Sequence, residues 1–153
     1  MGFVAHSGLG VSDLARSARF YCELLGFSPD RELAMTADQV SDFLGLERPA
    51  DMKAVYLYLG DFQLELLAFE PAGDNRVRER KMNQVGLTHI SIAVASVPAV
   101  LAKAADYGGE VLTRIGDMAA MIRDPDGQLV EILEATYAAG ERISGQYGKS
   151  LKP

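Results

Sequence analysis

Apolar and polar residues alternate along two stretches of the chain, residues 6–11 and 89–94, and each stretch begins with a histidine. A period of two is typical of a β-strand with one buried face. The bulky apolar residues fall on one face of each predicted strand. The opposite face carries the histidine and small residues only, with His6 beside Gly8 and Gly10, and His89 beside Ser91 and Ala93. Both histidines therefore have space beside their rings.

A helical pattern follows each of these strands. The first predicted helix starts at the capping residues Ser12 and Asp13 and ends at Gly26, and the second runs from Ser96 to the pair 108–109. The closing glycine lies at the same distance from the histidine in both copies, since 26 − 6 = 20 and 109 − 89 = 20. Strands are predicted after both helices, at residues 28–34 and 110–115.

Each copy then closes with a hairpin whose last strand has a central glutamate. Residues 54–59 turn at Gly60-Asp61 into residues 62–67, a register that pairs Tyr56 with Glu65. Tyr56 and Tyr58 would share the face of Glu65, where they are candidates either to orient a substrate or simply to pack. In the second copy, residues 118–123 turn through Asp124-Pro125-Asp126-Gly127 into residues 128–134, which contain Glu131.

The duplicated pattern predicts one α+β domain made of two tandem βαβββ modules. We expect a single domain over residues 1–135, with module one at about 3–70, a linker at 71–84, module two at about 85–135, and a weakly structured tail at 136–153. The first copy is longer, because its histidine and glutamate are 65 − 6 = 59 positions apart against 131 − 89 = 42 in the second. The extra residues fall at 35–51, where 36–45 resembles a capped helix, and form either a substrate lid or a plain surface insertion.

Composition narrows the classes of function. A chain of 153 residues with a formal charge of −6 fits one globular domain and argues against binding to a nucleic acid backbone. No apolar run is long enough to cross a membrane, and the N-terminus enters a strand pattern directly, so a cytoplasmic protein is expected. The single cysteine, Cys22, has no partner for an internal disulfide. The basic linker residues Arg76, Arg78, Arg80 and Lys81 form either a solvated crossover or a patch for a substrate carboxylate or phosphate.

The two histidines and the two strand glutamates predict a metal site. Glu65 and Glu131 lie in strongly apolar strands, where an unpaired charge is costly, and a divalent cation shared with His6 and His89 would neutralise both carboxylates. The alternative is a purely structural polar cluster. Two nitrogens and two oxygens suit Ni, Co, Zn, Mn or Fe better than Ca or Mg, and the absence of a cysteine cluster argues against a structural zinc.

Taken together, these motifs resemble the vicinal oxygen chelate (VOC) superfamily over about residues 4–135. The stretches that carry the resemblance are 6–14, Phe20-Tyr21, 24–27, 63–67, 86–89 and 123–132. The superfamily includes glyoxalase I, methylmalonyl-CoA epimerase, extradiol dioxygenases, fosfomycin-resistance enzymes and bleomycin-binding proteins. The resemblance implies paired βαβββ modules that form a cupped, partly closed mixed sheet around a metal held by His6, Glu65, His89 and Glu131.

A glutamate in each half is most similar to glyoxalase I, with methylmalonyl-CoA epimerase as another similar member. That resemblance implies a metal-dependent lyase or isomerase that chelates two vicinal oxygens of a small-molecule substrate and moves a proton next to a carbonyl. Glu131 or Glu65 would be the base, and a homodimer is expected. The alternatives are a non-heme Fe(II) dioxygenase, for which no further histidine is available, and a small-molecule-binding or resistance protein without turnover.

Overall fold

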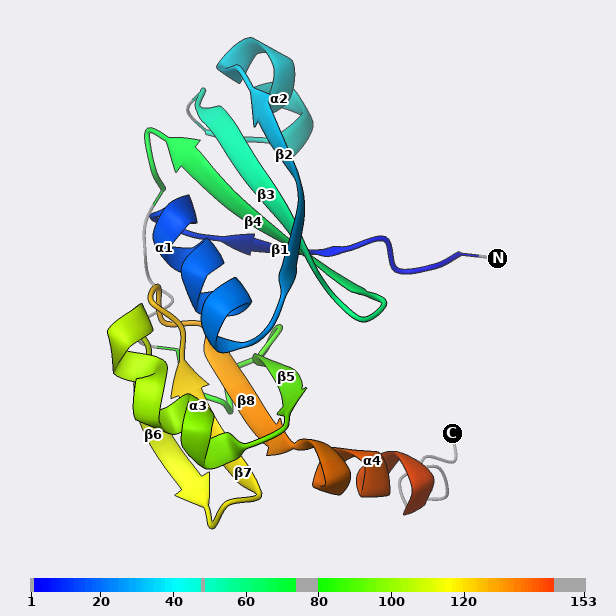
Figure 1. Cartoon of the computed structure of the whole chain (residues 1–153). Helices are drawn as coiled ribbons and strands as arrows, with labels where there is room; N and C mark the ends of the chain where they lie inside the picture. Colours follow the sequence, from blue (N-terminus) through cyan, green and yellow to red (C-terminus); the bar gives the residue numbers. More distant parts are fainter. Residues whose placement is uncertain (1, 48, 74–79, 145–153) are drawn as a thin grey trace.

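The chain folds into two successive modules, each a four-stranded mixed sheet with a helix on one side (Figure 1). The computed structural model describes residues 2–47, 49–73 and 80–144. The first module consists of β1 (Ser7–Gly10), α1 (Leu14–Arg19), β2 (Ser28–Met35), α2 (Ala37–Leu44), β3 (Asp51–Leu59) and β4 (Phe62–Glu70). The second consists of β5 (His89–Val94), α3 (Val97–Lys103), β6 (Glu110–Ile115), β7 (Ala119–Arg123) and β8 (Leu129–Glu134).

Strand order and register are equivalent in the two modules. The orders are β1-β4-β3-β2 and β5-β8-β7-β6, and the first strand of each module runs parallel to the last. Gly8 pairs with Glu65, and Ser91 pairs with Glu131, so each glutamate lies next to the residue two positions after a histidine. The predicted pairing of Tyr56 with Glu65 is confirmed. The predicted α+β fold of two tandem βαβββ modules is confirmed, and each module has its own four-stranded mixed sheet, with no strand pairing between the two sheets in the described residues.

The helices begin where the sequence predicts but end differently. Asp13 caps α1 by accepting a hydrogen bond from the Arg16 amide at 3.0 Å, and the helix continues as a π-helical turn, η1 (Phe20–Leu24), before Gly26 at φ 82°. Ser96 caps α3, which continues as a 3₁₀ turn, η3 (Ala104–Tyr107).

The prediction that Gly109 closes the second helix is wrong, because the left-handed residue there is Gly108, at φ 78°. Position 109 favours glycine for a different reason, because a Cβ at this position would lie 2.7 Å from Phe20 of the first module.

The insertion at 35–51 contains the short helix that the sequence predicts. Helix α2 follows Thr36, whose amide donates to the Gln39 side chain at 2.9 Å, and it ends at Gly45 in the left-handed conformation. Val40 is buried, and the helix packs against β3, whereas Phe43 is 88% exposed. The insertion is therefore a folded part of the first module.

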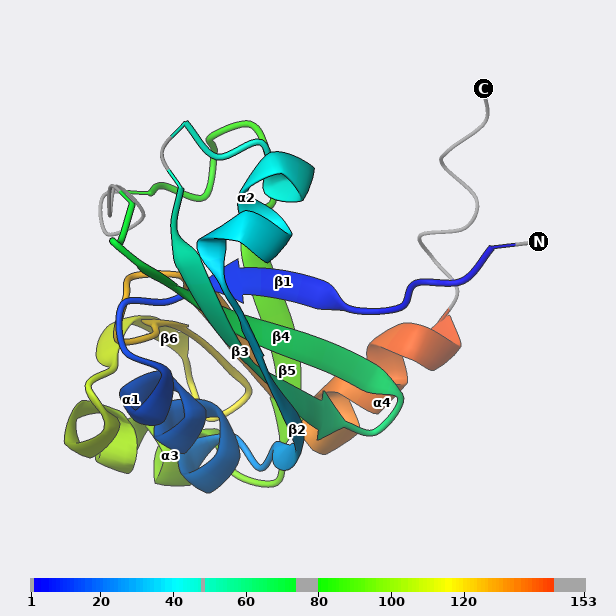
Figure 2. The ribbon, with the colours of Figure 1, turned by 90° about the horizontal axis from the view of Figure 1, so that it is seen from above.

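Two segments extend from the modules on the same side (Figures 1 and 2). One is the exposed N-terminal arm that precedes β1. The other is α4 (Ala135–Ser144), which follows β8 directly. A helix was not expected here, since glycine and polar residues predicted a weakly structured tail. Across the described chain, no helix has the length and apolarity needed to span a membrane.

A single hydrophobic core joins the two modules. Helices α1 and α3 lie side by side in both views of the ribbon (Figures 1 and 2). The core includes fully buried side chains from both modules, namely Phe20, Tyr21, Leu57, Leu64, Leu66, Val97, Ile122, Val130 and Ile132. The modules are therefore packed into one body through their helices and the helix-covered faces of their sheets.

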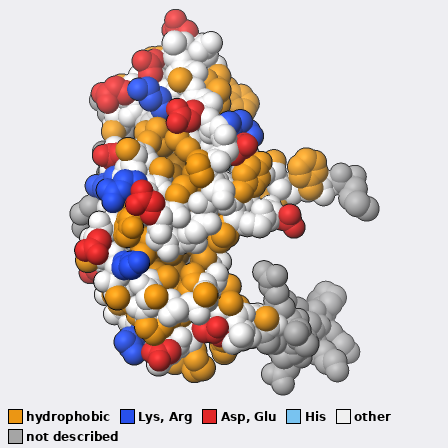
Figure 3. Space-filling view, in the orientation of Figure 1, with side chains coloured by type: hydrophobic (Ala, Val, Ile, Leu, Met, Phe, Trp, Pro, Cys, Tyr) orange, Lys and Arg blue, Asp and Glu red, His pale blue; other side chains and the backbone are white. Residues whose placement is uncertain are grey.

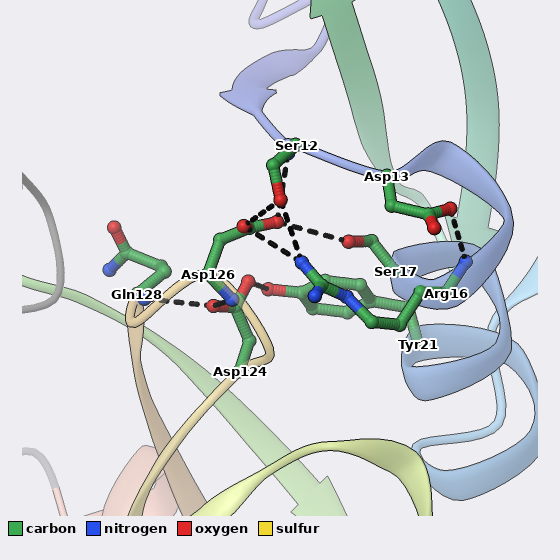
Figure 4. A network of polar contacts seen from close by, with 8 residues as sticks. All are labelled: Ser12, Asp13, Arg16, Ser17, Tyr21, Asp124, Asp126 and Gln128. Atoms are coloured by element: carbon green, nitrogen blue, oxygen red, sulfur yellow. Dashed lines mark hydrogen bonds and ion pairs between the residues drawn. The ribbon is translucent and has the colours of Figure 1, made fainter. Parts of the chain in front are cut away.

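A buried polar cluster also crosses the module boundary (Figure 4). Asp126, in the β7–β8 turn, accepts hydrogen bonds from the Ser12 amide at 3.0 Å and from the Ser17 hydroxyl at 3.4 Å, and it pairs with Arg16 at 2.9 Å. The Tyr21 hydroxyl donates to Asp124 at 3.0 Å. We call these residues, Ser12, Arg16, Ser17, Tyr21, Asp124 and Asp126, the intermodule cluster.

The pKa values of the two acids in the intermodule cluster, Asp124 and Asp126, are shifted in opposite directions. Burial raises the pKa of Asp124, although three hydrogen bonds oppose it. For Asp126, burial also acts upward, but the hydrogen bonds from Ser12 and the charge of Arg16 outweigh it, and the pKa is lowered. Asp126 therefore stays ionised, and its charge holds the first helix to the second module.

Candidate metal-binding site

His6 and Glu65 form the first half-site, on the sheet face opposite α1. His6 Nε2 lies 3.1 Å from Glu65 Oε2, and the side chain of Glu65 is only 9% exposed. His6 immediately precedes β1, and its ring meets the edge of Tyr56 at a centroid distance of 5.7 Å and an interplanar angle of 89°. A hydrogen bond to Glu65, together with burial, raises the pKa of Tyr56, so the tyrosine stays protonated beside the carboxylate. Glu65 is thus held from two sides.

His89 and Glu131 form the second half-site at the equivalent positions of the repeat. His89 Nε2 lies 3.6 Å from Glu131 Oε2, with side chains that are 30% and 33% exposed. The Ser91 hydroxyl donates to the same Glu131 oxygen at 2.7 Å. On the other side of the imidazole, Nδ1 is 2.9 Å from the Thr88 hydroxyl, which leaves Nε2 toward Glu131. Sequence reasoning treated Ser91 only as a small residue and missed both hydroxyl groups.

The His–Glu spacing of the first pair fits a shared cation, and that of the second pair is slightly wider. Ligand bonds of about 2.1 Å at angles between 90° and 109° place neighbouring donor atoms roughly 3.0–3.4 Å apart. The separations of 3.1 Å and 3.6 Å are close to this range. Within residues 2–47, 49–73 and 80–144, however, no three His, Cys, Asp or Glu side chains come together as a metal site. One chain therefore offers two half-sites, and the four-ligand set stays a prediction.

A mostly apolar cavity of about 500 Å³ opens beside the second half-site. His89 and Ser91 line it from β5, and Phe27, Leu59 and Phe62 line it from the first module. Its size suits part of a small organic molecule. A larger cavity of about 690 Å³ lies between α1 and β2–β3, and none of the four predicted ligands lines it. The smaller cavity is therefore the one relevant to the candidate site.

The predicted basic patch in the linker is only partly within the described residues. Arg76 and Arg78 lie outside them. Arg80 is described, and its guanidinium donates to the carbonyl of Val85 at 3.2 Å. That contact fixes the linker to the residues before β5.

Comparison with known proteins gives consistent matches over nearly the whole chain. A family model described as the Glyoxalase/Bleomycin resistance protein/Dioxygenase superfamily matches residues 3–132. A probable lactoylglutathione lyase from Synechocystis is 26% identical over 148 residues, which cover 88% of this chain and 96% of that protein.

Solved structures show the same fold at lower identity. The trypanothione-dependent glyoxalase I of Leishmania major superposes with a TM-score of 0.69 at 20% identity and covers 99% of this chain and 100% of its own. A glyoxalase family protein from Bacillus cereus has a TM-score of 0.74 at 16% identity, over 87% of this chain and 95% of its own.

Proposed function

This chain belongs to the glyoxalase/bleomycin resistance/dioxygenase superfamily, and we propose that it is a divalent-metal-dependent lyase or isomerase. Its reaction would move a proton next to a substrate carbonyl whose oxygen, with a vicinal oxygen, binds the metal. The observation that carries the proposal is the presence of two equivalent His–Glu pairs, 3.1 Å and 3.6 Å apart, on equivalent strands. The match to a probable lactoylglutathione lyase supports the reaction class.

His6, Glu65, His89 and Glu131 would hold the metal. A bound divalent cation polarises a chelated carbonyl and makes the neighbouring C–H acidic. Two imidazoles and two carboxylates favour Ni, Co, Zn, Mn or Fe. On a six-coordinate ion, four protein ligands leave positions for two substrate oxygens.

We infer that Glu131 is the residue that moves the proton. Glu65 is nearly buried and held by both His6 and Tyr56, whereas Glu131 is 33% exposed and is held by the single hydroxyl of Ser91 and by His89. A carboxylate that is more exposed and lies farther from its histidine can shift toward a substrate carbon, accept the proton and return it to the adjacent carbon. Glu65 then acts mainly as a fixed ligand.

We also propose that two copies of the chain assemble each complete site. Bringing both pairs together within one chain would require breaking the shared core and the intermodule cluster. A second copy can instead place its second half-site against the first half-site of its partner, in a symmetric dimer. The outline of the molecule is hollowed on the side where the N-terminal arm extends (Figure 3), which leaves space for a second copy there.

Two measurements test the proposal. Elemental analysis of the purified protein is expected to find about one transition-metal ion per chain, and metal-dependent turnover is expected with a hemithioacetal or a CoA thioester. Oxygen consumption that depends on Fe(II) would overturn the proposal in favour of a dioxygenase. Ligand affinity without turnover, unaffected by Glu131→Gln, would indicate a binding protein.

Complementation tests the shared site. At a metal concentration that does not saturate Glu65→Gln, this variant and Glu131→Gln are each expected to be nearly inactive alone. If sites are shared between copies, an equal mixture that has exchanged subunits regains about one quarter of the normal sites, because half the dimers are mixed and each has one intact site. If all four ligands came from one chain, mixing would restore nothing.

A further inference from the structure

An arginine lies against the first half-site without being one of its predicted ligands. The guanidinium carbon of Arg31 is 3.9 Å from the centroid of the Tyr56 ring, a cation–π geometry. The edge of the same tyrosine meets His6, and its hydroxyl bonds Glu65. Arg31 is thus connected to both candidate ligands through one aromatic ring.

An irregularity in β2 places Arg31 on this face. Pro29 pairs with Leu57 and Glu32 pairs with Val55, so Asp30 and Arg31 together stand opposite Tyr56. Two residues opposite one are the mark of a β-bulge, which redirects a side chain that regular alternation would place elsewhere. The bulge therefore positions a cation beside the half-site.

The head group of Arg31 is accessible to a ligand. Its side chain is 55% exposed, and its ion pair in the described chain is with the adjacent Asp30, through Nη1 at 3.0 Å. Arg31 also forms a side-chain hydrogen bond with Tyr56. A guanidinium carries five N–H donors in a planar fork, so donors remain after these two contacts. The Tyr56 ring supports the guanidinium, whose fork suits bidentate binding of a carboxylate or phosphate.

The net charge of the protein disfavours anionic ligands. The chain carries a formal charge of −6, so an anionic group that approaches the protein meets net repulsion. Arg31 provides a local positive charge at the rim of the half-site. A substrate that coordinates the metal through its reacting end therefore has a favourable place for a negative group at its other end.

We propose that Arg31, supported by Tyr56, binds an oxyanion group of the substrate and is a specificity-determining residue. This inference rests on the proposed function, because it assumes that the half-site receives the reacting end. The oxyanion is a carboxylate or a phosphate, carried by the part of the substrate that does not react. Arg31 takes no part in the proton transfer.

Calorimetric binding tests the proposal independently of turnover. Three probes are titrated into the wild-type protein and Arg31→Gln with zinc present: S-methylglutathione, its diester, which has no carboxylate, and coenzyme A. Arg31→Gln is expected to weaken at least one anionic probe about tenfold or more and to leave the diester unchanged. Loss with S-methylglutathione identifies a carboxylate, and loss with coenzyme A identifies a phosphate.

Matched variants separate this role from a general effect of charge. Arg114 is 57% exposed and pairs with Asp117 at 3.2 Å in the second module, so Arg114→Gln makes the same charge change at a comparable surface site and is expected to leave all affinities unchanged. Tyr56→Phe keeps the ring and should retain most of the affinity for the anion. Tyr56→Leu removes the ring and should lose affinity as Arg31→Gln does.

Equal affinities of the wild-type protein and Arg31→Gln for both anionic probes would overturn the inference, as would failure of both probes to bind the wild type. Turnover is measured separately. Arg31-dependent binding without metal-dependent turnover would contradict the proposed function and leave the anion site intact.

Discussion

In the first module the glutamate is buried between a histidine and a tyrosine, whereas in the second it is one-third exposed and bonded to a serine. The strands, registers and ligand types are equivalent, so the difference comes from neighbours. Tyr56 stands opposite Glu65 in the first sheet, and Met121 stands opposite Glu131 in the second. A duplicated scaffold thus keeps the four predicted ligands at equivalent positions, while the residues around them leave one carboxylate buried and the other partly exposed, which is the difference on which the proposed roles rest.

The largest expected effect comes from exchanging the two glutamates for glutamine. With metal at saturation, Glu131→Gln is expected to lower kcat by about 10²–10⁴-fold, because the base is lost. Glu65→Gln should lower metal affinity more than kcat. Steady-state kinetics at several metal concentrations distinguish the two effects. A larger loss of kcat at saturation in Glu65→Gln would reverse the assigned roles.

Breaking the contact between the modules should have the next largest effect. Asp126→Asn is expected to destabilise the protein by about 1–3 kcal/mol at neutral pH, with Arg16 contributing less because its side chain is 38% exposed. The pKa of Asp126 is lowered by folding, so this contribution is present above its unfolded pKa and is lost as pH falls through the folded pKa. Asp124, whose pKa is raised by folding, has the opposite effect on stability: its contribution is present below its unfolded pKa and is lost as the pH rises through its folded pKa.

Urea unfolding at a series of pH values measures this effect. The difference between the wild type and Asp126→Asn should be constant near neutral pH and shrink below about pH 4. Asp117→Asn, which alters an exposed ion pair, is the matched control. A difference that is independent of pH would contradict the role given to the charge of Asp126.

The glycines at 26 and 109, one after each helix, give a smaller, structural comparison. A Cβ at Gly109 would lie 2.7 Å from Phe20 and 3.1 Å from two backbone oxygens, so Gly109→Ala is expected to cost about 1–3 kcal/mol through crowding. Gly26 has open space but a φ of 82°, so Gly26→Ala should cost about 1–2 kcal/mol through backbone strain alone. Thermal unfolding measures both. Only Gly109→Ala should be partly rescued by shortening Phe20 to leucine.

The smallest effect is expected at Ser91. Ser91→Ala removes the hydroxyl that donates to Glu131 at 2.7 Å and makes the second half-site more like the first, where Gly8 occupies the equivalent position. Poorer positioning of Glu131 should lower kcat by about two- to tenfold. Metal content should remain normal. An unchanged kcat would show that His89 alone orients the carboxylate.

Much of the fold could be predicted because it follows from local patterns. The alternation after His6 and His89, the two-residue turn at Gly60-Asp61 and the capped helix after Thr36 each depend on neighbouring residues, and the structure confirms all three.

The remaining features depend on distant contacts. Ser12 was assigned to a helix cap, but its amide and hydroxyl bind Asp126, 114 positions away. The sequence does not single out Arg31. Regular alternation assigns each strand residue to one face of the sheet, and the bulge in β2 interrupts that alternation at Arg31. The separation of the four predicted ligands into two pairs follows from how the modules pack, which the repeat itself does not specify.

The edge position of β5 in its sheet affects how the purified protein should be stored. Among the described residues, β5 pairs with β8 on one side only over His89–Val94, and its isoleucines face the core, whereas β1 is shorter and contains two glycines. An unpaired strand edge of this length can recruit strands from other molecules and start aggregation. Concentrated or metal-stripped preparations should therefore lose material through the second module first, and a lysine introduced on this edge would protect samples during storage.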